Sequence, residues 1–180
     1  MNKQNIKDHN VSKHNIEIIS KVEDISMDDE WYDIADSSHF WLEWRLIAMI
    51  KQINQLNIPL NRKFKVLEVG CGTGILRNSI EKNTKWIVDA ADLNLDALSF
   101  AKSARGKTFL YNIFDENTTM IESYDIVILY DVLEHIKLTK PFIDSLIKHI
   151  KPKGYLLINV PAIDTLYSAY DEKIGHFRRY

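Results

Sequence analysis

The chain has 180 residues, with 23 lysines and arginines against 25 aspartates and glutamates, so its net charge is −2. This balance argues against nucleic-acid binding through a general basic field, and a single cysteine, Cys71, excludes an intramolecular disulfide framework. No apolar run approaches the roughly 18 residues of a membrane span, and the polar start lacks the apolar stretch of a signal peptide, so the expected location is cytoplasmic.

The first 30 residues are polar and mixed in charge, and we expect a loosely held arm there with one short helix. The predicted domain covers residues 31–180. It begins with a helix over residues 37–56, because apolar residues recur there at helical spacing, and Pro59 follows.

Beyond Pro59, short apolar runs alternate with helical patterns. Strands are predicted over residues 64–69, 86–91, 108–113, 125–130 and 155–160, helices over 75–81, 93–104 and 141–150, and a turn over 151–154. Such alternation indicates βαβ units and a parallel sheet that is buried on both faces. The predicted fold is α/β, a doubly wound Rossmann-like sheet.

Three glycines, Gly70, Gly72 and Gly74, come directly after the first strand of this sheet. Glycine lets a ligand approach the backbone closely and permits positive φ, and doubly wound sheets bind nucleotide-like ligands at the carboxyl ends of their strands. The third glycine of a dinucleotide fingerprint would fall on Ile75, which disfavours a nicotinamide-dependent oxidoreductase.

The stretch from Glu68 to Gly74 resembles the first motif of class I S-adenosylmethionine-dependent methyltransferases. The further matches, in chain order, are His39-Phe40-Trp41, Asp92-Leu93-Asn94, Leu133-Glu134-His135, the turn at Gly154 and His176-Phe177-Arg178-Arg179-Tyr180. A subgroup of the family carries both the His-Phe-Trp helix and the H-x-R-R-Y element. The resemblance covers about residues 31–180.

The resemblance implies S-adenosylmethionine as cofactor and S-adenosylhomocysteine as product. The residues expected to contact this cofactor are Glu68, Gly70, Cys71, Gly72, Gly74, Asp92, Leu93, Asn112 and Asp115. Asp92 suits the two ribose hydroxyls as a double acceptor, although Asp89 is a rival on the same strand and a helix cap is the structural alternative. Asn112 and Asp115 both qualify for the adenine amino group.

Methyl transfer from a sulfonium is an in-line displacement, so the protein mainly positions two reactants and excludes water. At most one base is needed, and His135 and His176 are the candidates because histidine titrates near neutral pH. Asp131, at the end of the fourth strand, is expected to face the methionine end of the cofactor or the acceptor. Structural roles are the alternative for all three residues, and Cys71 is not expected to act as a nucleophile.

The expected acceptor is a small molecule with a sugar, lipid-linked or phenolic group, and no nucleic acid is expected. Side chains predicted to face the acceptor are His39, Trp41, Arg178, Arg179 and Tyr180. The two arginines suit an anionic acceptor, or alternatively pair with carboxylates to hold a lid. No group of Cys, His and Asp residues has metal-ligand spacing, so no metal site is predicted.

The sequence stops at Tyr180, where members of the family usually continue into a further helix and two strands. We therefore expect a sheet that lacks its last two strands and has an exposed edge, through which a homodimer would form. Three readings stay open: a fragment of a longer protein, a natural truncation that dimerises, and an inactive relic that binds cofactor or docks a partner.

Overall fold

The computed structural model describes residues 16–22 and 40–180, and its centre is a parallel sheet in the order β1-β4-β3-β2-β5-β6. The strands are β1 (Ile16–Ile18), β2 (Lys65–Val69), β3 (Ile87–Asp92), β4 (Thr108–Leu110), β5 (Tyr124–Tyr130) and β6 (Ile150–Asn159). The chain runs outward from β2 in one direction and then returns to add β5 on its other side. A crevice forms at such a reversal, outside the carboxyl ends of the strands. The predicted doubly wound α/β fold is confirmed.

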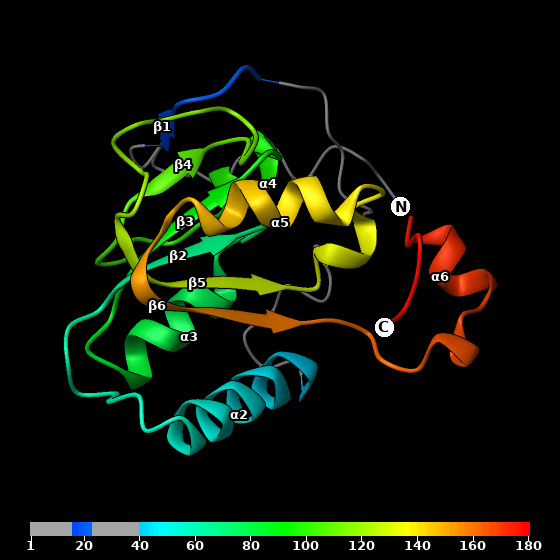
Figure 1. Ribbon diagram of the computed structural model, residues 1–180, viewed down its shortest axis with the longest axis horizontal. Coiled ribbons are helices and arrows are strands. Elements are labelled where there is room, and N and C mark those ends of the chain that lie inside the picture. Colours follow the sequence, from blue (N-terminus) through cyan, green and yellow to red (C-terminus); the bar gives the residue numbers. More distant parts are fainter. Residues whose placement is uncertain (1–15, 23–39) are drawn as a thin grey trace, which may run out of the picture.

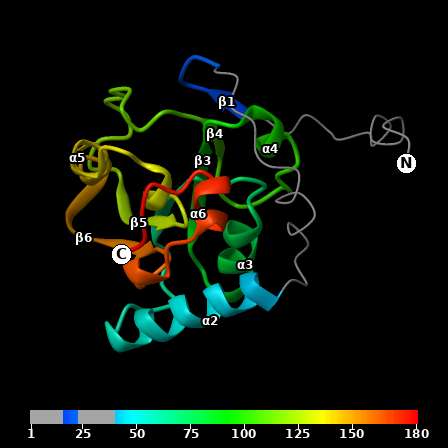
Figure 2. The same ribbon diagram turned by 90° about the vertical axis from the view of Figure 1, so that its right-hand side faces the viewer.

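Helices cover both faces of this sheet (Figure 1). They are α2 (Phe40–Gln55), α3 (Ile75–Asn83), α4 (Leu95–Ser99), α5 (Thr139–Ile147) and α6 (Ala169–Lys173), with 3-10 turns η1 (Leu133–His135) and η2 (Asp164–Leu166). The helices α2 and α3 lie on one face and α5 on the other, while α6 lies beyond the carboxyl ends of β5 and β6 (Figures 1 and 2). Within the described ranges, no helix is both long and apolar enough to cross a bilayer.

The core is divided by the sheet because successive strand residues point to opposite faces. On one face, Ile126 and Ile128 of β5 share a buried cluster with Met49 of α2. On the other face, Val127 and Leu129 pack in a cluster with α5. The nearly continuous apolar run of β5 follows from this burial on both sides.

One correction concerns the N-terminal arm. Ile16–Ile18 form strand β1, where no strand was predicted, with Ile16 beside Thr108 and Ile18 beside Leu110 of β4. Only three residues pair and Ile18 is exposed, so the strand leaves almost no periodicity in the sequence. Residues 1–15 and 23–39 lie outside the described residues.

Two predicted boundaries also change. The helix predicted over 93–104 is the short α4, which starts after Asn94, whose side chain accepts a hydrogen bond from the Ala97 N–H at 2.9 Å. The turn predicted over 151–154 is an irregularity inside β6, because Ile150 pairs with Tyr124 and Tyr155 with Ile126. Four residues therefore bulge out where local sequence alone indicated the end of an element.

Candidate functional site

The loop between β2 and α3 carries the three glycines at the carboxyl end of the central strand. Gly70, Gly72 and Gly74 have φ of 74°, 53° and 74°, in the left-handed region that favours glycine. A Cβ on Gly70 would lie 2.2 Å from Cγ2 of Val132, which follows β5. The loop thus packs directly against the segment that follows β5.

Asp92, the last residue of β3, places its carboxylate against this loop. Its Oδ2 accepts a hydrogen bond from the Gly72 N–H at 2.7 Å and its Oδ1 accepts one from the Asn94 N–H at 2.9 Å. The side chain is half-buried, and burial raises its pKa. An acceptor of hydrogen bonds therefore lies beside the glycines.

The rival carboxylate, Asp89, is occupied elsewhere. It is buried and accepts hydrogen bonds from the Lys107 N–H at 2.8 Å and the Tyr124 hydroxyl at 3.1 Å. The geometry favours Asp92 for contact with a ligand in the loop, and the ribose role of Asp92 stays a prediction.

Glu68 is a buried carboxyl two residues before the first glycine. It is 3% exposed, and its Oε2 has no hydrogen-bond partner among the described residues. Burial raises its pKa to about 7, against the opposing effect of the nearby Arg45 and Arg77 guanidinium groups. Burial also raises the pKa of Cys71 well above its usual value, which fits the expectation that this thiol is no nucleophile.

The raised pKa of Glu68 predicts a specific pH dependence of stability. A carboxyl with a higher pKa in the folded than in the unfolded chain contributes stability that is complete below pH 4.5 and is lost as the pH rises to about 7. We expect the wild-type chain to lose about 3 kcal/mol relative to Glu68→Gln across this range. Urea unfolding of both proteins across the same pH range measures the difference, and parallel stability curves would contradict it.

Two residues were predicted for the adenine end, and they differ in exposure. Asn112 is half-buried directly beyond β4, where its N–H donates to the Ser20 hydroxyl at 2.8 Å and its Oδ1 accepts from the Phe114 N–H at 3.0 Å. Asp115 is exposed, and Leu93, the other predicted contact, is half-buried. Both polar residues remain candidates.

Asp131 directly follows β5 and has a left-handed conformation with φ of 54°. Its carboxylate pairs with the Arg45 guanidinium at 3.2 Å and accepts a hydrogen bond from Asn159 Nδ2 at 2.6 Å. Arg45 also lies over the Tyr130 ring, 5.6 Å from its centroid. Asp131 is therefore anchored from α2 and β6 at once.

Sequence reasoning missed Arg45 as part of this site, although a signal existed. Arg45 lies four residues before Met49 and eight before Ile53, so it belongs to the buried stripe of α2. A charged residue on such a stripe needs a partner, because burying an unpaired charge is costly. Here the partner is Asp131.

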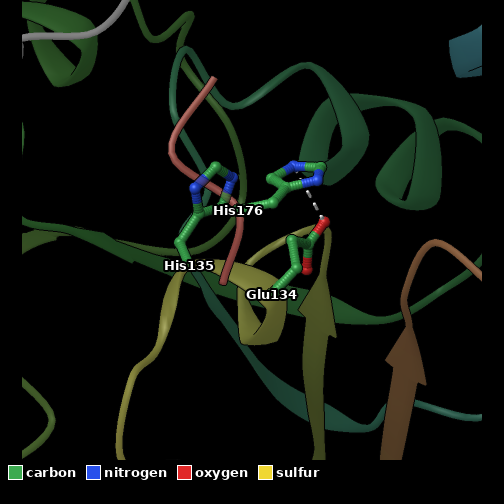
Figure 3. Close-up of side chains that lie close together, drawn as sticks. All are labelled: Glu134, His135 and His176. Atoms are coloured by element: carbon green, nitrogen blue, oxygen red, sulfur yellow. Dashed lines mark ion pairs between the residues drawn. The ribbon is translucent and has the colours of Figure 1, made fainter. Parts of the chain in front are cut away.

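The two predicted bases meet in a cluster with Glu134 beyond the end of β5 (Figure 3). The His135 and His176 rings have centroids 4.7 Å apart at an interplanar angle of 79°, and His176 Nε2 lies 3.9 Å from Glu134 Oε1. Burial raises the pKa of Glu134 to about 7, and burial together with His176 lowers the pKa of His135.

The same cluster is a group of side chains that could hold a metal ion, which the spacing in the sequence did not predict. One ligand atom from each of Glu134, His135 and His176 lies within 4.8 Å of the others. The spacing was invisible in the sequence because His176 is 41 positions beyond His135 and joins the cluster only through the docking of the tail.

Asp171, the buried first-turn residue of α6, organises that tail. It accepts hydrogen bonds from the Ser168 N–H at 2.9 Å, from His176 Nδ1 at 3.0 Å and from Arg179 Nε at 2.8 Å. These donors hold the pKa of Asp171 well below its usual range despite burial.

The remaining tail residues bond to groups of this chain. An Arg178 NH2 donates to the Lys137 carbonyl at 3.0 Å, and the Tyr180 hydroxyl donates to the Leu133 carbonyl at 3.3 Å. Two roles were considered for Arg178 and Arg179, namely binding an anionic acceptor and holding a lid. Their hydrogen bonds favour the second role, because they hold the tail in place. Contact with an acceptor stays a prediction. His39 and the side chain of Trp41 lie outside the described residues.

Comparison with known proteins identifies the family of the chain. A family profile for a methyltransferase domain matches residues 41–179. Ubiquinone biosynthesis O-methyltransferase of Rickettsia conorii is 32% identical over 100 residues, covering 54% of this chain and 35% of that protein. The protein of the same name from Hydrogenovibrio crunogenus is 29% identical over 143 residues, covering 73% of this chain and 58% of that protein. The chain thus spans less than two thirds of the length of these relatives.

Solved structures show the same fold. Haemonchus contortus phosphoethanolamine N-methyltransferase 2, in complex with S-adenosyl-L-methionine, matches with a TM-score of 0.63 at 19% identity, over 87% of this chain and 42% of that chain. A putative methyltransferase of Bacillus halodurans matches with a TM-score of 0.57 at 23% identity, over 72% of this chain and 61% of that chain. The family profile covers most of the chain, so the chain belongs to the methyltransferase-domain family, and its resemblance to class I S-adenosylmethionine-dependent methyltransferases is confirmed.

Proposed function

We propose that the protein transfers a methyl group from S-adenosylmethionine to a hydroxyl of a small-molecule acceptor. The observation that carries the proposal is the Asp92 carboxylate, 2.7 Å from the Gly72 amide at the carboxyl end of the central strands. A double acceptor beside a glycine backbone suits the ribose of an adenosine.

The cofactor would extend from this carboxylate toward Glu68. The ribose would take the oxygens of Asp92, and the adenine would lie by Leu93 with its amino group at Asn112 or Asp115. The methionine end would lie along the glycine loop. Its ammonium and sulfonium charges would suit the buried Glu68 carboxylate, which has an oxygen without a partner among the described residues. S-adenosylmethionine brings the reactive methyl group, and the protein fixes its direction.

A hydroxyl acceptor is supported by the names of the relatives, which are O-methyltransferases of ubiquinone biosynthesis. An acceptor hydroxyl must lose a proton as its oxygen takes the methyl group. His135 and His176 lie at the same end of the sheet as the glycine loop, since Glu134 is two residues beyond Val132, which packs on Gly70. Either imidazole suits the role of proton acceptor.

Calorimetric titration with S-adenosylhomocysteine, with NAD as the control, tests the cofactor assignment. We expect one equivalent of S-adenosylhomocysteine to bind and NAD not to bind. Binding of NAD alone would overturn the assignment in favour of an oxidoreductase. Methyl transfer to a panel of phenolic and sugar hydroxyls, followed by mass spectrometry, then separates an enzyme from an inactive binding protein.

We also propose that two copies associate through β6, the edge strand of the described sheet on the β5 side. An edge strand presents unpaired backbone donors and acceptors to a second chain. Sedimentation velocity should then show a dimer, and Ile158→Pro in this strand should shift it to monomer. A monomer at all concentrations contradicts the proposal.

A further inference from the structure

The contacts around His176 leave one ring nitrogen facing a carboxylate. Nδ1 of His176 donates to Asp171 Oδ1 at 3.0 Å, so in the neutral form of the ring the lone pair lies on the other nitrogen, Nε2. That Nε2 lies 3.9 Å from Glu134 Oε1, and the dashed line in Figure 3 joins the two side chains. A lone pair and a carboxylate at this separation repel each other unless a proton or a metal ion lies between them.

Glu134 makes the requirement stronger because it is 1% exposed. Its Oε2 is buried and has no hydrogen-bond partner among the described residues. Buried carboxylates without a partner are costly, and native proteins satisfy them by a proton, a charged side chain or a metal ion. The other two members of the cluster are histidines, whose neutral rings each offer a nitrogen lone pair to a metal ion.

We infer that Glu134, His135 and His176 form a binding site for a divalent transition-metal ion of the zinc class. Two imidazoles and one carboxylate are the ligand set that zinc takes in sites with an open position, and the same set suits other divalent transition metals but not calcium or magnesium. The ligand atoms lie within 4.8 Å of one another, whereas bonds of about 2.1 Å place ligand atoms roughly 3–3.5 Å apart. Binding of an ion would therefore require the three side chains to move closer together, including His176 Nε2 and Glu134 Oε1, which lie 3.9 Å apart.

The surroundings match what metal ligands need. A histidine ligand almost always donates its second N–H to a carboxylate or carbonyl, which fixes its tautomer and direction. Asp171 does this for His176 and is itself held by Ser168 and Arg179. The Phe177 N–H donates to the Glu134 carbonyl at 2.8 Å. This hydrogen bond joins the tail that carries His176 to the turn η1 that carries Glu134 and His135.

Three protein ligands leave at least one position of the ion open. The site follows β5, whose end packs on the glycine loop through Val132 and Gly70. An acceptor hydroxyl bound at the open position would have a lower pKa and would lose its proton more easily. This consequence rests on the proposed function, whereas binding of the ion does not.

The test titrates the full chain, freed of metal by a chelator, with Zn²⁺ by calorimetry and with Co²⁺ by visible absorption. We expect one ion per chain, with Co²⁺ bands that report imidazole ligation. Glu134→Gln and His176→Ala should bind about 100-fold more weakly or not at all, and Asp171→Asn roughly 10- to 100-fold more weakly. Glu172→Gln, which removes an exposed carboxylate on the same helix, should bind as the wild type does.

Each other outcome overturns the inference. Failure of the wild-type chain to bind would mean that a proton joins His176 to Glu134. Equal binding by wild type and Glu134→Gln would place the ion elsewhere. Glu134→Gln keeps the shape of the side chain, so it decides the matter even where His176→Ala does not fold. Titration of the same samples with S-adenosylhomocysteine shows separately whether the cofactor proposal fails.

Discussion

Replacement of Asp92 by alanine is expected to raise the dissociation constant for S-adenosylhomocysteine by about 100-fold or more. The carboxylate would lose two charge-assisted hydrogen bonds to the ribose, each worth about 1.5–3 kcal/mol, and every 1.4 kcal/mol is tenfold in affinity. Calorimetric titration of the variant and the wild type at one pH and salt concentration measures the change.

The control is Asp89→Asn, which alters the rival carboxylate on the same strand. Its side chain bonds the Lys107 N–H and the Tyr124 hydroxyl, so this variant should lose stability and keep its affinity within a few-fold. The opposite pattern, with Asp92→Ala binding normally and Asp89→Asn not binding, would transfer the ribose role to Asp89. Thermal unfolding of both variants separates loss of affinity from loss of fold.

Gly70→Ala is expected to cost about 2–5 kcal/mol of unfolding free energy. A non-glycine residue in the left-handed region costs about 1–2 kcal/mol, and Gly70 has φ of 74°. The new Cβ would also lie 2.2 Å from Cγ2 of Val132, which forces movement of a packed segment at a cost of about 1–3 kcal/mol. Urea unfolding measures the total.

Two variants separate the backbone effect from the clash. Gly175→Ala has the same backbone problem, with φ of 80°, but its nearest neighbour is His135 Nδ1 at 3.8 Å, so only the backbone part should remain. In the Val132→Ala background, Gly70→Ala should recover most of the clash energy. An equal loss of unfolding free energy for Gly70→Ala and Gly175→Ala would show that Val132 moves away from the new Cβ at no energetic cost.

The sequence predicted best where one local rule acts alone. The run from Tyr124 to Tyr130 is apolar because both faces of the strand are covered, so both its existence and its place in a parallel sheet could be inferred. The loop of Gly70, Gly72 and Gly74 could also be predicted from a local rule, because few residues other than glycine adopt a positive φ. The elements β2, β3, β5 and α3 accordingly lie within about two residues of their predicted bounds.

Features that depend on distant partners could not be predicted in this way. β1 is a strand because β4 offers it hydrogen bonds, and its three residues have little pattern of their own. The partnership of Arg45 with Asp131 joins α2 to the end of β5. The cluster of Glu134, His135 and His176 exists only once the tail has docked, so no spacing rule for metal ligands could reveal it.

The pairing of β1 with β4 sets an order of events during synthesis of the chain. Ile16 pairs with Thr108, and 108 − 16 gives 92 residues between the partners. At synthesis rates of about 5–20 residues per second, the ribosome needs roughly 5–18 seconds to make that interval. Through this time β1 has no partner strand to pair with, so β1 can join the sheet only after Thr108–Leu110 have been made.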